Sequence, residues 1–273
     1  MSDLPVRRLL IDLEQPVERH WCGGDPFLTA WFNALSMSFP VGEQFFIDAV
    51  RDGFKTLPAD RQVAFQAEVQ GFVGQEATHR RIHTLFNAQI ARHGLVNAWE
   101  PRALARLKAT QGADVRHALG ITAANEHFTA LFAEWLLARP EVFGQTEDRL
   151  KTLWLWHSAE EAEHKSVAFD LYQALGGSHA WRVKWMRRVT LIFLVDTLRQ
   201  TVNNLQHDGS LWQWRTWRSA ARHLLGREGL FTVSFRPWRR YFRPDFHPGQ
   251  DESALAERWL QDNAARFKLV GAR

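Results

Sequence analysis

Two stretches of sequence decide the fold: FQAEVQGFVGQEATHRRIHTLFNAQI at residues 65–90 and LKTLWLWHSAEEAEHKSVAFDLYQAL at residues 150–175. Each places apolar residues at alternating spacings of four and three, the period of a helix with one buried face. In each, a glutamate and a histidine three residues later interrupt that face, and the two patterns align with an offset of 85 residues. We therefore expect two long helices that bury the same kind of polar site.

The surrounding sequence predicts two further core helices. The four expected helices span residues 25–53, 58–94, 114–138 and 146–177, with Asp25-Pro26 as the first N-terminal signal, Pro40 as a kink and Thr146 as the last cap. Because residues 94–113 would form a long crossover, these helices describe an all-α, ferritin-like four-helix bundle. Additional C-terminal helices are expected at about 180–206 and from near Asp251. The predicted divisions are an N-terminal arm (1–24), the bundle (25–177) and a basic, Trp-rich extension (178–273).

Four glutamates and two histidines are expected to meet inside this bundle. Glu76-x-x-His79 and Glu161-x-x-His164 place each pair on one helix face, because residues three apart are neighbours on a helix. Glu43 in FPVGEQFF and Glu126 in TAANEHF stand among apolar neighbours on the other two helices. Burying carboxylates without partners costs several kcal/mol, and a bound cation would offset that cost.

The spacing predicts a dinuclear metal site. One Glu from each of two helices and one Glu-x-x-His from each of the other two is the carboxylate ligand set of ferritin-like bundles. The predicted cofactor is two iron ions, with manganese or zinc as alternatives. The predicted ligands are Glu43, Glu76 and His79 for one ion and Glu126, Glu161 and His164 for the other, with Glu76 and Glu161 as bridges. The competing interpretation is that these residues are surface charges on misaligned helices.

Two more histidines are candidates for catalytic roles. His157 lies one turn before Glu161 and is either a third histidine ligand or a channel histidine; the His-x-x-x-Glu-x-x-His spacing resembles that of arylamine N-oxygenase-type di-iron proteins. His83 either lines a pocket or supplies a proton behind the ligands. Glu160 and Glu163 flank the metal face and are read as solvated or as groups that support ligands. Three other side chains are read as structural, namely His127, His93 and Cys22.

The basic charge is concentrated in one segment. Residues 181–244 carry 13 Lys/Arg against three Asp/Glu, although the whole chain has a net charge of only +4, and they hold six of the 13 tryptophans. Tryptophan and arginine on amphipathic helices suit a membrane interface, so a peripheral membrane contact is one interpretation. The other is that the indoles pack this extension onto the bundle. Nucleic-acid binding is not expected, because no known module is visible.

The remaining sequence argues against a membrane-spanning or disulfide-bonded protein. The longest apolar run, residues 189–195, is far shorter than a spanning helix needs, and no secretory signal pattern is visible. Cys22 is the only cysteine, so it cannot form a disulfide within the chain. The expected location is the cytoplasm, with membrane association left open.

Four segments, FPVGEQFF, GFVGQEATHRRIHTLFN, WHSAEEAEHKSVAFDLY and FRPDFHP, resemble the bacterial family called predicted metal-dependent hydrolase. The resemblance covers nearly the whole chain and implies metal binding and hydrolysis. From the ligand pattern itself, however, the leading expectation is dioxygen activation for oxidation of a small apolar or acyl substrate, with a separate electron donor. Hydrolysis by a metal-bound hydroxide is the first alternative, and metal storage without catalysis is the second. The expected pocket residues are Phe72, Phe46, Trp154 and His157, and a homodimer is left open.

Overall fold

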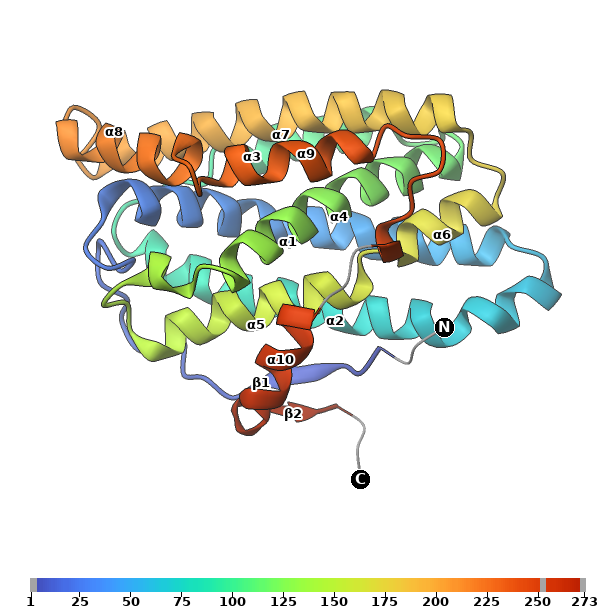
Figure 1. Cartoon of the computed structure of the whole chain (residues 1–273), viewed down its shortest axis with the longest axis horizontal. Helices are drawn as coiled ribbons and strands as arrows, with labels where there is room; N and C mark the ends of the chain where they lie inside the picture. The colour runs from blue at the N-terminus through green and yellow to red at the C-terminus, as the bar shows by residue number, and fades with distance from the viewer. Residues whose placement is uncertain (1–3, 251–253, 271–273) are drawn as a thin grey trace.

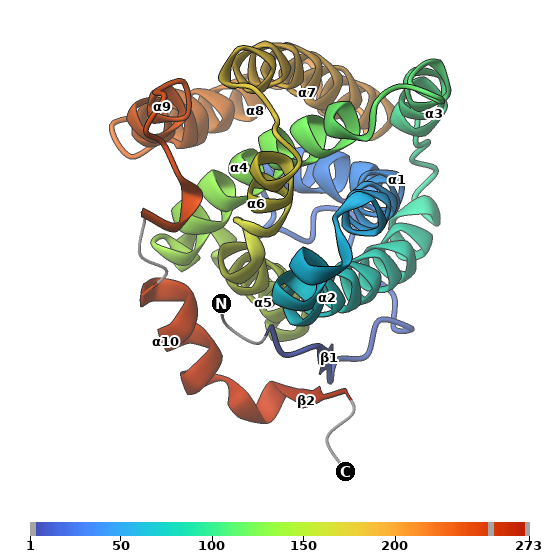
Figure 2. The same cartoon turned by 90° about the vertical axis from the view of Figure 1, so that its right-hand side faces the viewer.

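Long helices build the protein, whose computed structural model describes residues 4–250 and 254–270 (Figures 1 and 2). The helices are α1 (Pro26–Thr56), α2 (Ala59–Ala91), α3 (Trp99–Ala109), α4 (Val115–Leu137), α5 (Asp148–His164), α6 (Val167–Ala174), α7 (His179–His207), α8 (Trp214–Ala220), α9 (Leu230–Arg240) and α10 (Ala254–Asp262). Short 3₁₀ or π turns are η1 (Pro140–Phe143), η2 (Ala221–Leu225), η3 (Pro248–Gln250) and η4 (Ala264–Arg266). The strands β1 (Arg7–Leu9) and β2 (Phe267–Leu269) pair antiparallel. The predicted all-α class is confirmed.

The four-helix core consists of α1, α2, α4 and the α5–α6 pair. The Asp25 carboxylate caps α1 by accepting a hydrogen bond from the Leu28 amide at 3.0 Å, and Pro26 fills the first turn. Pro40 lies inside α1, which continues to Thr56 rather than ending near residue 53. The boundaries of α2 and α4 lie within three residues of those expected.

The expected single helix over residues 146–177 is wrong. The Thr146 hydroxyl donates to the Phe143 carbonyl instead of capping the helix, and α5 begins at Asp148. The helix is interrupted at Lys165 and Ser166, directly after His164. Because both residues keep right-handed helical φ and ψ, α6 continues the same apolar pattern after this break.

The crossover contains a helix that was not predicted. Helix α3 occupies the middle of the expected connection and ends before Gly112, which has a φ of +79° and thus suits glycine. Arg102 and Arg106 of α3 form ion pairs with the buried Asp196 of α7. These ion pairs connect the crossover to α7.

Two apolar clusters divide the core lengthwise. One contains Trp21, Phe86 and Trp154, and the other contains Phe72 and Phe169. Along α2 and α5, the ionisable residues lie between the residues that belong to the first cluster and those that belong to the second. Closely packed apolar side chains therefore flank the polar site on both sides.

Helices α7, α8 and α9 form an outer layer over α1 and α4 (Figures 1 and 2). Trp181 stacks on His117 of α4 with ring centroids 4.2 Å apart, and the Trp185 indole donates to the same imidazole. These two indoles therefore pack the C-terminal extension onto the bundle, as the second interpretation of its tryptophans expected. Trp212, Trp214 and Trp217 are instead exposed. Within residues 4–250 and 254–270, no helix combines the length and apolar character needed to cross a membrane.

The N-terminal arm lies across α2, where two glycines make room for it. A Cβ on Gly71 would stand 2.4 Å from the Leu4 Cβ, and one on Gly74 would stand 2.3 Å from a Val6 methyl. The arm then enters β1, where Arg7 is opposite Leu269 of β2. The predicted divisions at residues 24 and 177 stay predictions, and a helix start at Asp251 falls outside the described residues.

Candidate metal centre

The six predicted ligands are all buried inside the four-helix core. Each of these residues is at most 4 % exposed. They come from every core helix: Glu43 from α1, Glu76 and His79 from α2, Glu126 from α4, and Glu161 and His164 from α5. The competing interpretation of misaligned surface charges is therefore wrong.

The ligand atoms converge on two overlapping groups. Glu43, Glu76 and His79 each offer an atom within 4.8 Å of the others, as do Glu76, Glu161 and His164. The Glu126 carboxylate lies 3.4 Å from His164 Nε2. Glu76 belongs to both groups, as expected of a bridging ligand. The first group matches the predicted trio, and the ligand roles themselves stay predictions.

Most of these ligand atoms have no hydrogen-bond partner within the described part of the chain. Both carboxylate oxygens of Glu43, Glu76 and Glu126 are unpaired, as is one oxygen of Glu161. The ring atoms His79 Nδ1 and His164 Nε2 are unpaired too. Buried polar atoms normally find partners, so this concentration of acceptors fits one or more divalent cations. Mixed carboxylate and imidazole donors suit such ions.

Burial sets the protonation of the metal-free site. It raises the pKa of Glu43, Glu76 and Glu126 well above the ordinary glutamate value. For Glu161, burial also raises the pKa, but the neighbouring histidines more than offset it and leave the pKa well below the usual range. Burial by itself lowers the pKa of His79, but the hydrogen bonds and negative charges of Glu160 and Glu161 together outweigh burial and raise this pKa to about 10. Without a bound cation, the raised pKa values favour the protonated forms of these three glutamates and of His79 at neutral pH.

Metal binding is consequently expected to release protons and to strengthen as the pH rises. A carboxyl whose pKa is raised must lose its proton before it can ligate, and so must the imidazolium of His79. The apparent affinity should rise about tenfold per pH unit for each proton released. Calorimetric titration with Mn²⁺ in buffers of different ionisation enthalpy measures the proton count. An enthalpy independent of the buffer would contradict this charge arrangement.

A hydrogen-bond chain fixes the orientation of His157. The Asn87 amide nitrogen donates to the Ser36 carbonyl at 2.9 Å, which turns the Asn87 oxygen toward the Ser36 hydroxyl, and this hydroxyl donates to it at 2.7 Å. Ser36 Oγ therefore accepts from His83 Nδ1 at 2.8 Å, and His83 Nε2 accepts from His157 Nδ1 at 2.6 Å.

These hydrogen bonds leave the lone pair of His157 Nε2 facing Glu161 Oε1, which is 2.9 Å away. Two acceptors at this distance need a cation or a proton between them. Burial, followed by the charge of His79, lowers the pKa of His157 to about 4 and disfavours the proton. The geometry thus favours the ligand alternative for His157, whereas His83 orients it from behind.

A second set of contacts orients the other two histidines. Glu160 Oε2 lies 2.9 Å from His79 Nε2, so that Nδ1 faces the centre. Its other oxygen accepts from the Arg7 guanidinium at 3.0 Å. Gln75 Oε1 lies 3.1 Å from His164 Nδ1, and this leaves Nε2 for the centre. Such contacts fix the tautomer and raise the basicity of metal-binding histidines.

The same contacts correct the reading of the flanking acids. Glu160 is fully buried, so the solvated alternative is wrong for it, while Glu163 receives two hydrogen bonds from Arg7 at 2.6 and 2.9 Å. Arg7 and Gln75 were missed by sequence reasoning. Arg7 lies in an arm without periodicity, and nothing distinguishes Gln75 from any polar neighbour of Glu76.

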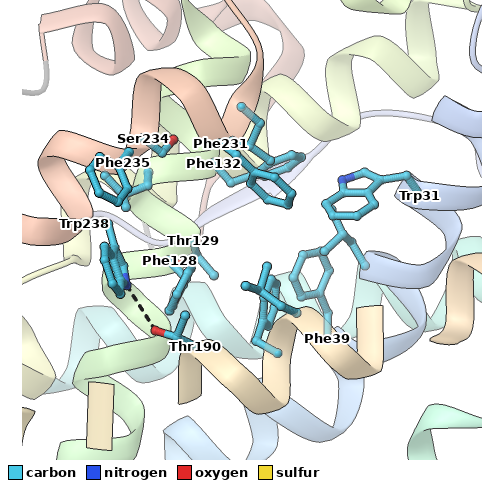
Figure 3. A pocket seen from close by; sticks show the side chains of 15 residues that line it. Trp31, Phe39, Phe128, Thr129, Phe132, Thr190, Phe231, Ser234, Phe235 and Trp238 are labelled. Carbon is cyan, nitrogen blue, oxygen red and sulfur yellow. Dashed lines mark hydrogen bonds between the residues drawn. The ribbon is translucent and has the colours of Figure 1, made fainter. Parts of the chain in front are cut away.

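An apolar cavity of about 300 Å³ adjoins the histidine side of the centre (Figure 3). Its wall includes Phe39, whose ring centroid lies 4.5 Å from that of His83 and 4.8 Å from that of His157. The expected pocket residues do not line this cavity: Phe72, Phe46 and Trp154 are absent from its wall, and His157 lies behind Phe39. Helices α7 and α9, outside the four-helix core, supply much of the lining.

Comparison with known proteins gives one match. A family model described as "Predicted metal-dependent hydrolase" matches residues 5–252. Neither the curated proteins nor the solved structures include a match.

This match overturns the leading expectation of a di-iron centre that activates dioxygen, and it favours the hydrolytic alternative. Paired Glu-x-x-His segments mark a candidate cation site, but they do not define the reaction. Hydrolysis needs neither a reductant nor oxygen, because a metal ion can generate the nucleophile from water. Since the match spans most of the sequence, the chain belongs to the family of predicted metal-dependent hydrolases.

Proposed function

We propose that the protein is a hydrolase whose catalytic centre is the buried carboxylate and histidine site. The observation that carries the proposal is the set of unpaired carboxylate oxygens and ring nitrogens enclosed between α1, α2, α4 and α5. Such a site is costly to bury without cations. The ligand set would hold two divalent ions, with iron, manganese and zinc all compatible with its donors.

When bound, the ions would supply a water-derived nucleophile near neutral pH and polarise the bond to be cleaved. The chain's own contribution is orientation. Glu160 and Gln75 hold the outer ring nitrogens of His79 and His164, so that the inner nitrogens face the centre and, once deprotonated, would ligate a metal ion. His157 is held in the same way by His83, which places a third imidazole toward Glu161.

The surroundings of the centre also exclude bulk water. The two apolar clusters close it along the bundle, and Phe39 separates it from the cavity. Electrostatic interactions with a substrate are stronger in such a dry site than at a surface. The adjoining cavity supplies a place for a reactant, which a storage protein would not need.

Removal of metal is expected to abolish hydrolysis, and readdition is expected to restore it. The purified protein would be stripped with a chelator, dialysed, and assayed against a panel of p-nitrophenyl carboxylic and phosphate esters after adding Mn²⁺, Fe²⁺ or Zn²⁺. The rate should be the same with and without dioxygen, because the nucleophile comes from water. Hydrolysis that persists in the stripped protein, or that occurs with none of the esters, would refute the proposal.

A further inference from the structure

We propose that the outer face formed by α7 and α9 docks on an anionic phospholipid bilayer and that the cavity between these helices takes up one acyl chain. The inference goes beyond the hydrolase assignment. Its test uses no hydrolytic readout, so the two proposals can fail separately.

The chemistry of the cavity selects an apolar chain. Aromatic side chains dominate its wall, among them Trp31, Phe39, Phe132, Phe193 and Trp238 (Figure 3). No charged side chain belongs to the lining that the structure describes, and the polar side-chain groups are three hydroxyls and two indole N–H groups. A charged or strongly polar ligand would therefore lose its hydration without compensation.

Two of the three hydroxyls of the cavity, those of Thr190 and Thr129, form hydrogen bonds within the protein. Thr190 Oγ1 donates to the Met186 carbonyl and accepts from the Trp238 indole at 3.1 Å (Figure 3). Thr129 Oγ1 donates to the Glu126 carbonyl. The cavity volume of about 300 Å³ lies at the lower end of the range for small-molecule pockets, so the cavity would hold a single short acyl chain.

The cavity opens onto an apolar outer surface. Phe231 and Phe235 of α9 line it and are 36 % and 54 % exposed. On α7, the exposed residues Leu191, Ile192, Val195 and Leu198 form a continuous apolar stripe at helical spacing. Thr190, Phe193 and Leu194, which alternate with that stripe, point toward the cavity. The opening is thus bordered by apolar side chains that a bilayer would cover.

Basic residues extend this surface and indicate an anionic partner. Lys184, Arg187 and Arg188 are exposed and continue the α7 stripe toward the N-terminal end of the helix. Arg236 and Arg239 are exposed on α9. Opposing acidic charge is scarce, since Asp196 is buried beneath the layer in its pairs with α3. Clustered lysine and arginine beside apolar side chains suit the negative surface of a phospholipid bilayer.

Exposed indoles lie in the same outer layer. Trp212, Trp214 and Trp217, in and just before α8, are 91 %, 63 % and 44 % exposed. Helix α8 continues the layer of α7 and α9 in both views (Figures 1 and 2). Tryptophan favours the boundary between lipid and water. Contact with a bilayer would therefore explain why these three large side chains are exposed.

Vesicle flotation tests the surface. Vesicles of phosphatidylcholine and phosphatidylglycerol in equal parts are expected to bind the protein at least about tenfold more tightly than phosphatidylcholine alone, and binding should weaken with salt. The double variant Arg187→Glu/Arg188→Glu should lose this preference. The matched control is Arg81→Glu/Arg92→Glu, which changes two exposed arginines in and directly after α2 and should retain the preference. Helix α2 lies on the other side of the bundle from α7 (Figure 2).

Fluorescence titration with dansyl-labelled undecanoic acid tests the cavity. We expect one probe per chain, displaced by unlabelled dodecanoic acid, and at least about tenfold weaker binding to Ser234→Trp, which fills the lining. Thr232→Trp, on α9 but outside the lining, is the control.

Three outcomes would overturn the proposal. The first is equal binding to both vesicle types, and the second is equal probe binding to the Ser234 and Thr232 variants. The third is a dimer in solution that Leu191→Asp dissociates while vesicle binding is absent, since this would assign the face to a second copy of the chain.

Discussion

Glu161→Gln is expected to lose bound metal and to lower the hydrolytic rate at least about 100-fold. Glu161 Oε1 lies 3.4 Å from both His79 Nδ1 and His164 Nε2 and 2.9 Å from His157 Nε2, so this single oxygen joins the ligand histidines. Loss of a residue that merely supports a ligand costs about 10- to 100-fold in metal affinity or activity. Loss of a central ligand should reach at least the upper end of that range.

The matched control is Glu134→Gln, which removes an exposed carboxylate from α4 and should leave metal content and rate unchanged. Metal analysis of purified protein, far-ultraviolet circular dichroism and size-exclusion chromatography distinguish loss of metal from loss of folding. If folded Glu161→Gln keeps its full metal content, the ligand assignment is wrong.

Arg7→Ala is expected to destabilise the protein by about 3 kcal/mol and to weaken metal binding about tenfold. Arg7 is buried between two carboxylates, so its removal breaks two ion pairs and leaves the buried Glu160 with His79 as its remaining charged partner. Glu160 also accepts the hydrogen bond that orients His79. The first effect is measured by urea unfolding of the metal-free protein and the second by metal titration.

Arg8→Ala provides a close control, because Arg8 is the adjacent residue of β1 and is exposed. Arg7→Lys keeps the charge but not the two parallel hydrogen bonds to Glu163, and should restore part of the stability. Equal stabilities for the Arg7 and Arg8 variants would show that the arm does not support the centre.

The sequence predicts the ligands well because they interrupt a periodic pattern. A glutamate or histidine at a core position is conspicuous once the buried face of the helix is known. Because the α2 and α5 patterns match at a constant offset, their Glu-x-x-His residues are expected at the same depth in the bundle. The same periodicity hides the break at Lys165, since His164, Ala168 and Leu171 keep their spacing across it. A change in backbone hydrogen bonding that preserves the buried face leaves no trace in hydrophobicity.

The residues that orient the predicted ligands, and the cavity beside the centre, could not be predicted in this way. Arg7 bonds to residues 153 and 156 positions later in the chain, and only the completed fold brings them together. The cavity depends on how α7 and α9 are placed over α1 and α4, whereas periodicity reports which face of a helix is buried but not its partner. The pocket prediction failed for this reason.

The pairing of β1 with β2 also has a consequence for the order of events during synthesis. Residues 7 and 269 must meet, so this strand pair forms only after the ribosome has added the last residues of β2. A nascent chain that already contains all six ligands still lacks the β2 strand that secures the arm bearing Arg7. Such long sequence separation slows folding. The contact between the two strands is therefore completed only after the helices that carry the six predicted ligands have been synthesised.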